Sequence, residues 1–72
     1  MRLRDLEQRV VSFNVRNPVG SLFKFYPVIG GREFRIRATR SEAYVLSGHT
    51  AVVFLEGESG CVALDALKEL KK

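Results

Sequence analysis

The sequence predicts an all-β domain, a small barrel of five or six short strands with a short N-terminal helix and a C-terminal helical turn. Three observations lead to this fold class. The chain has only 72 residues, which is enough for one small core. Apolar residues alternate with polar ones along much of the chain, as in half-buried strands. Turns rich in glycine and proline separate these runs. We therefore expect one domain over residues 1–72, with its strands rolled into a barrel.

The first residues have helical spacing. Leu3, Leu6 and Val10 lie at positions i, i+3 and i+7, so they share one side of a helix. One or two helical turns are expected here, because so short a helix needs to dock on other elements to be stable.

From Val10 onward, apolar residues recur at every second position instead of at helical spacing. Apolar and polar residues alternate over residues 11–15, which predicts a half-buried strand. Pro18 cannot donate a backbone hydrogen bond, and Gly20 suits a turn, so this strand is expected to end at residues 17–20.

Two strands are predicted in the middle of the chain. Residues 21–26 form a run rich in aromatic side chains, and Gly30 with Gly31 suits a tight turn after it. Residues 32–39 show the cleanest alternation in the chain. On this pattern, the inward side of the second strand carries Phe34, Ile36 and Ala38, and its outward side carries Glu33, Arg35, Arg37 and Thr39.

Residues 40–47 allow two interpretations. Thr39 to Glu42 matches a helix-capping box, and Gly48 could end a helix over residues 40–47. Alternatively, a loop leads into a short strand over residues 43–46, which turns at Ser47 and Gly48. The tyrosine, valine and leucine of this segment favour the strand.

The last twenty-odd residues show the clearest order of elements. A β-branched and aromatic run over 50–55, an acidic glycine-containing turn over 56–60 and a second apolar run over 61–64 predict a hairpin. Asp65 would then cap a short helical turn that reaches Leu70.

This order resembles the closing segments of SH3-like barrels of the bacterial or phage kind. The resemblance covers about residues 6–70 and depends on pattern: residues 31–36 resemble an inner strand, 50–57 the penultimate pair, and 60–67 the final strand with its helical turn. It implies a barrel, and it implies no particular function, since one fold serves many functions.

Charge is distributed unevenly along the chain, whose net charge is +4. Residues 1–40 hold nine basic and three acidic residues, whereas residues 41–72 hold three basic and five acidic ones. Every arginine lies in the first of these segments. This asymmetry predicts an anionic partner on one side of the molecule.

The arginine-rich strand is the candidate binding site. Arg35 and Arg37 lie two apart and project from the same side of the strand, where guanidinium groups suit phosphate oxygens. An outward-facing aromatic ring nearby, from Phe23, Phe25 or Tyr26, could stack on a base. The alternative is that the two arginines only pair with Glu33, Glu56 or Glu58. We therefore predict a non-enzymatic nucleic-acid-binding module whose contacts come from Lys24, Arg32, Arg35, Arg37 and Arg40.

A second hypothesis is a protein–protein interaction or structural module, of phage or plasmid origin, that acts as a homo-oligomer. Leu64, Leu67 and Leu70 recur every three residues. We expect a core this small to leave part of this set exposed, so the three leucines form a candidate face for a homodimer or another protein partner.

Other classes of function find little support. Cys61 and His49 could act as nucleophile and base, but no third residue orients them, so we expect no enzyme and no small-molecule substrate. One cysteine and one histidine exclude an internal disulfide and do not make a structural zinc site, and no cofactor is expected.

The sequence also bears on location. Its longest uncharged apolar stretch, residues 51–55, is too short to span a bilayer. The charged start at residues 1–5 does not resemble a secretory signal. A lone cysteine fits a reducing compartment, so we expect a cytoplasmic protein that does not contact membranes.

Overall fold

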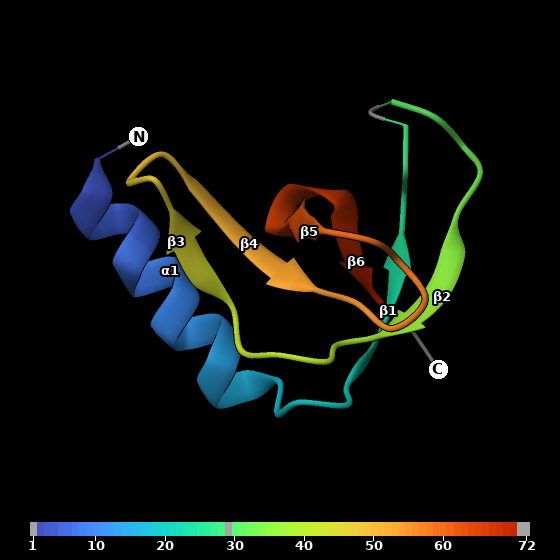
Figure 1. The fold of residues 1–72 in the computed structure, drawn as a ribbon, viewed down its shortest axis with the longest axis horizontal. Helices are drawn as coiled ribbons and strands as arrows, with labels where there is room; N and C mark the ends of the chain where they lie inside the picture. The colour runs from blue at the N-terminus through green and yellow to red at the C-terminus, as the bar shows by residue number, and fades with distance from the viewer. Residues whose placement is uncertain (1, 29, 71–72) are drawn as a thin grey trace.

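The computed structural model describes residues 2–28 and 30–70. Met1, Ile29, Lys71 and Lys72 lie outside the described residues, and Ile29 belongs to the segment between the two predicted central strands. The strands form two three-stranded antiparallel sheets, with the orders β2-β1-β6 and β3-β4-β5 (Figure 1). The elements are α1 (Leu3–Arg16), β1 (Leu22–Phe25), β2 (Arg35–Ala38), β3 (Tyr44–Leu46), β4 (Thr50–Phe54), β5 (Cys61–Ala63), the 3-10 turn η1 (Leu64–Ala66) and β6 (Leu67–Glu69).

The predicted all-β barrel is wrong. The fold is a small mixed α/β domain, in which a long helix accompanies two sheets that do not close into a barrel. An isolated antiparallel bridge between Thr39 and Leu55 links the sheets where β2 and β4 end. Because residues 11–15 are helical, the strand expected there is not available to a barrel, and α1 packs beside β3 and β4 instead.

The N-terminal helix runs through the segment predicted as a strand. It has 14 residues and ends at Asn17, whose backbone N–H donates to the Phe13 carbonyl at 2.8 Å. Leu6, Val10 and Phe13 lie at i, i+4 and i+7, and Leu6 is buried while the other two pack against the core. The valines at 11 and 15, which suggested a strand, are exposed. The segment therefore follows the helical period, with its core-facing side formed by Leu6, Val10 and Phe13.

One side chain holds α1 to the segment before β3. Asn14 Nδ2 donates to the Ala43 carbonyl at 3.0 Å, and the Ala43 N–H donates to Asn14 Oδ1 at 2.8 Å. The asparagine amide thus pairs with the backbone of Ala43 much as a neighbouring strand would. In Figure 1 the helix lies along β3, on the side of the molecule away from β1 and β2.

The other predicted strands are confirmed, including the short strand that was one of two interpretations of residues 40–47. β3 turns into β4 through residues 47–49, where Ser47 and Gly48 have positive φ values of 53° and 71°. The hairpin of β4 and β5 forms as predicted, with Phe54 opposite Cys61.

The C-terminal segment differs from the predicted helical turn over residues 65–70. Only η1 is helical, and β6 then returns along β1 with Leu67 opposite Phe25. The strand forms because β1 offers it a free edge for backbone hydrogen bonds.

The core lies between the sheets and beneath the helix. Val53 of β4 and Leu55, the residue after this strand, are fully buried, at 0% exposure. The buried core cluster consists of Leu6, Phe25, Ala43, Ala51, Val53, Leu55 and Leu64.

Candidate functional site

The register of β1 and β2 decides which side chains of this sheet face solvent. Phe23 and Phe25 of β1 point into the molecule and are 4% and 7% exposed. Their partners on β2 are Arg37 and Arg35. Directly opposed residues project from the same side of a sheet, so the arginines lie on the inner side at the edge of the sheet.

The predicted orientation of strand 32–39 is therefore wrong. Ile36 and Phe34, predicted to face inward, are 42% and 45% exposed. Either side of β2 carries side chains that could face the core, and a shift in register by one residue exchanges the inward and the outward side. The two inward phenylalanines of β1 decide the matter, because burying them forces the even-numbered residues of both strands outward.

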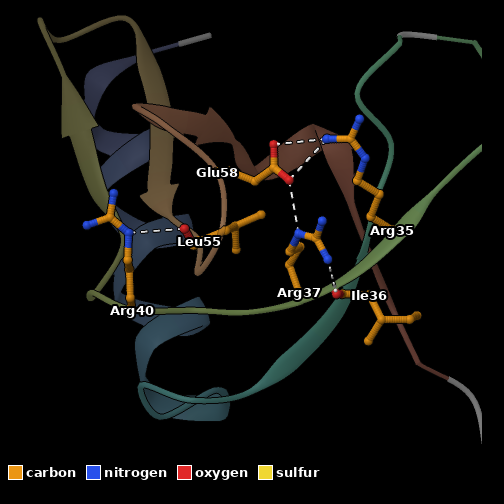
Figure 2. A network of polar contacts seen from close by, with 6 residues as sticks. All are labelled: Arg35, Ile36, Arg37, Arg40, Leu55 and Glu58. Carbon is orange, nitrogen blue, oxygen red and sulfur yellow. Dashed lines mark hydrogen bonds and ion pairs between the residues drawn. The ribbon is translucent and has the colours of Figure 1, made fainter.

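Arg35 and Arg37 converge on one carboxylate. Arg37 Nε donates to Glu58 Oε2 at 2.9 Å, and Arg35 Nη1 donates to the same oxygen at 3.2 Å (Figure 2). The Glu58 side chain is only 14% exposed. The alternative interpretation was that these arginines pair with Glu33, Glu56 or Glu58, and the structure shows the pairing with Glu58. The cluster ties β2 to the turn between β4 and β5.

The arginines lower the pKa of Glu58. The hydrogen bond from Arg37 is the largest cause, Arg35 adds to it, and partial burial of the carboxyl opposes both. A carboxylate that accepts charge-assisted bonds prefers to stay ionised. Glu58 therefore neutralises part of the arginine charge that the sequence suggested for phosphate.

Replacing Glu58 with glutamine is expected to lower the melting temperature at pH 7 and to make the protein less sensitive to acid. The pKa of Glu58 is lower in the folded chain than in the unfolded chain. Its contribution to the stability of the fold is therefore complete above about pH 4.3, and it is lost as the pH falls through the pKa of the folded state. Melting curves between about pH 5 and pH 2 measure this. Glu56→Gln, an exposed change in the same turn, should keep the acid sensitivity of the wild type; equal curves for all three proteins would contradict the assignment.

The remaining predicted contact residues lie elsewhere. Arg40 stands apart from the Glu58 cluster, with its guanidinium 4.7 Å from the centre of the Phe54 ring and its Nε donating to the Leu55 carbonyl at 3.0 Å (Figure 2). Arg32 is exposed before β2. Lys24 projects from the opposite side of the sheet to Arg35, because the two occupy adjacent rows of the ladder. The structure does not bring the five residues into one stripe.

A different surface gathers cationic and aromatic side chains. We call it the outer face, and it is the side of sheet β2-β1-β6 turned away from the core. Lys24 is directly opposite Ile36 on β2 and Lys68 on β6. The outer face consists of Leu22, Lys24, Tyr26, Phe34, Ile36, Lys68 and Leu70.

Each lysine of the outer face lies over an aromatic ring. Lys24 Nζ is 5.0 Å from the centre of the Phe34 ring, and Lys68 Nζ is 5.4 Å from that of Tyr26. The two rings are 5.6 Å apart. These distances fall in the range of cation–π attraction and of aromatic contact. The four side chains therefore form one connected cluster.

The pairing of the lysines has an electrostatic cost. Like charges directly opposite each other on neighbouring strands are destabilising. Within residues 2–28 and 30–70, the salt bridges all use arginine, and neither lysine has an acidic partner. Among the described residues, the outer face thus combines exposed apolar surface with two lysines that form no salt bridge, and an anion bound there would relieve the repulsion.

The sequence prediction missed Phe34 and Lys68 as parts of this surface. Alternation over residues 22–26 places Leu22, Lys24 and Tyr26 on one side, which is a usable signal. The role of Lys68 depends on β6 being a strand, and the sequence suggested a helical turn there.

The predicted oligomer face does not exist as a unit. Leu64 is 5% exposed and belongs to the core, and Leu67 packs against that core. Leu70 alone is exposed, at 37%, and it lies on the outer face. The three-residue spacing would align them on a helix, but a strand sends Leu67 inward and Leu70 outward.

Cys61 and His49 are not brought together. Cys61 lies opposite Phe54 at one end of β4, and His49 precedes Thr50 at the other end; the strand between Thr50 and Phe54 alone spans about 13 Å. Cys61 instead lies near Tyr44, whose pKa is raised by burial and further by the thiol.

The described residues offer neither a cluster for a metal ion nor a membrane-spanning helix. They contain no group of three or more His, Cys, Asp or Glu side chains that could hold a metal ion. None of their helices combines the length and the apolar character needed to cross a membrane.

Comparison with known proteins adds no family to this description. The chain matches no family model, no curated protein and no solved structure. The function must therefore be argued from the outer face and its surroundings.

Proposed function

We propose that this protein is a non-enzymatic, cytoplasmic module that binds single-stranded nucleic acid through the outer face. The observation that carries the proposal is the opposed pair Lys24 and Lys68, each seated over an aromatic ring and lacking an acidic partner among the described residues. The net charge of +4 favours an anionic partner in general.

The chemistry of the cluster suits a single strand. Each of its lysines can contact a backbone phosphate, and the bound phosphates would offset the repulsion between the two positive charges. Tyr26 and Phe34 can stack on bases that are not already paired, as aromatic side chains on sheet surfaces do. A duplex keeps its bases stacked inside, so it would use the lysines but not the rings.

The double variant Lys24→Gln/Lys68→Gln is expected to bind a labelled oligonucleotide of about twelve nucleotides at least tenfold more weakly than the wild type. Fluorescence anisotropy at several salt concentrations measures this. Each lost phosphate contact should reduce the slope of log K against log salt by about 0.7, and two by about 1.4.

A matched control removes the same charge from another surface. Arg2 and Arg4 are exposed at the start of α1, so Arg2→Gln/Arg4→Gln tests the effect of net charge alone and should change the affinity much less. Absence of binding at low salt, or equal losses in both double variants, would contradict the proposal. Duplex of the same length should bind more weakly than the single strand.

A homo-oligomeric interaction module is the second candidate, and the same surface favours it. Leu22, Ile36 and Leu70 of the outer face are 55%, 42% and 37% exposed. However, a second copy placed face to face would bring two more lysines to the same surface. This candidate would be favoured if sedimentation showed a dimer that is lost when Ile36 is replaced, and if the protein bound no oligonucleotide.

A further inference from the structure

A hollow of about 560 Å³ borders the outer face. Tyr26 and Lys68 belong both to the outer face and to the lining of the hollow. The end of β5 and the η1 turn contribute Ala63, Asp65 and Ala66 to the same lining. The volume lies in the range of about 300–1,000 Å³ that is usual for small-ligand sites. A single strand of nucleic acid bound across the outer face would therefore pass beside this hollow.

The lining combines one aromatic residue, Tyr26, with several small residues. The Tyr26 N–H donates to the Ala66 carbonyl at 2.9 Å, which holds the tyrosine beside η1. The other described lining residues are mostly small, namely Gly30, Gly31, Ala63 and Ala66, together with Val28. A flat group can enter such a hollow and lie against the Tyr26 ring.

Asp65 is the acidic residue among those that line the hollow, and another residue orients its side chain. Arg9 of α1 donates to Asp65 Oδ1 at 2.6 Å. The Asp65 side chain is 81% exposed, and Asp65 is one of the residues that line the hollow. The ion pair leaves Oδ2 and a further lone pair of Oδ1 able to accept hydrogen bonds, and a carboxylate has no proton to donate.

The bases differ in what they offer to a carboxylate. Guanine presents two adjacent donors, N1–H and the N2 amino group, on its Watson–Crick edge. Uracil and thymine present one N–H between two carbonyl oxygens, which a carboxylate repels. Adenine and cytosine present an amino group beside an acceptor nitrogen. Hydrogen bonds on this edge are the usual means of reading an unpaired base.

We propose that the hollow receives a guanine base of the bound single strand, with the base against Tyr26 and its N1–H and N2 amino group donating to Asp65. This proposal rests on the proposed function, because the strand must first lie on the outer face. It makes Asp65 a specificity-determining residue and leaves Lys24 and Lys68 to contact phosphate.

The test compares three oligonucleotides of about twelve nucleotides: oligothymidylate, the same strand with one central guanine, and the same strand with inosine at that position. Inosine keeps N1–H but lacks the N2 amino group. For the wild-type chain we expect the guanine strand to bind about tenfold more tightly than oligothymidylate, with the inosine strand between them. Anisotropy at low salt gives the three affinities.

Asp65→Asn should bind the guanine strand and oligothymidylate about equally, because its amide opposes the guanine donors with an NH₂ group. Glu56→Gln is the matched control, since it removes one negative charge at an exposed position outside the hollow. It should keep the guanine preference while raising all affinities slightly. The circular dichroism spectrum confirms that each variant is folded.

The outcomes separate the two proposals. Binding of all strands without a guanine preference overturns the guanine pocket and leaves the proposed function standing. A guanine preference that persists in Asp65→Asn also overturns the assignment of Asp65. Absence of binding by every strand at low salt overturns both proposals, since no base is then delivered to the hollow.

Discussion

Leu55→Ala is expected to lower the free energy of unfolding by about 2–5 kcal/mol. Leu55 is 0% exposed and belongs to the buried core cluster, and it also pairs with Thr39 in the bridge that joins the two sheets. Truncation would leave a cavity where the helix and both sheets meet. At about 0.05–0.15 kcal/mol per residue, a domain of this size has only about 4–11 kcal/mol in total. The variant should therefore be largely unfolded at moderate urea concentrations.

Urea denaturation followed by circular dichroism measures this loss. Val15→Ala is the control, because Val15 is 78% exposed on α1; it should change the free energy of unfolding by less than about 0.5 kcal/mol. A Leu55→Ala variant as stable as this control would show that the core does not lie between the two sheets.

Asn14→Ala is expected to cost about 2–4 kcal/mol, because two hydrogen bonds are lost and a backbone N–H and C=O are left without partners. Both bonds reach Ala43, which is 4% exposed, so water cannot easily replace them. Melting temperature and urea midpoint are the measurements. Far-ultraviolet circular dichroism should also show helix lost early in the transition, since this pairing holds α1 to β3.

Two further variants sharpen the result. Asn14→Asp keeps an acceptor for the Ala43 N–H but cannot donate to the Ala43 carbonyl when ionised, so an intermediate loss is expected at pH 7. Gln8→Ala changes an exposed polar residue of the same helix and should be close to neutral. If Asn14→Ala were also neutral, the docking of α1 on the segment before β3 would be wrong.

The segment over residues 11–15 shows why local pattern misleads. Its valines and Phe13 fit a period of two, and Leu6, Val10 and Phe13 fit a helix equally well. The choice depends on partners that are distant in sequence. Phe13 stacks on Phe23 with ring centres 5.3 Å apart, and Asn14 pairs with Ala43. Neither contact can be inferred from the residues of the segment.

The candidate site shows the same limit. The charge asymmetry of the chain and the aromatic run over residues 21–26 pointed to a cationic surface near aromatic rings, and Lys24, one of the predicted contact residues, lies on the outer face. The arginines that the sequence emphasised are instead held by Glu58. Lys68 became a candidate only because β6 pairs with β1.

The sequence by itself determined most strand positions and turns, because these depend on alternation and on residues such as Gly48 that tolerate positive φ. Only the tertiary structure decided that the sheets stay separate, that residues 11–15 are helical, and which side of β2 faces solvent. Those outcomes depend on register and on contacts between distant segments. A one-residue shift in register reverses every side chain of a strand at almost no local cost, so burial of Phe23 and Phe25 had to select the outer face.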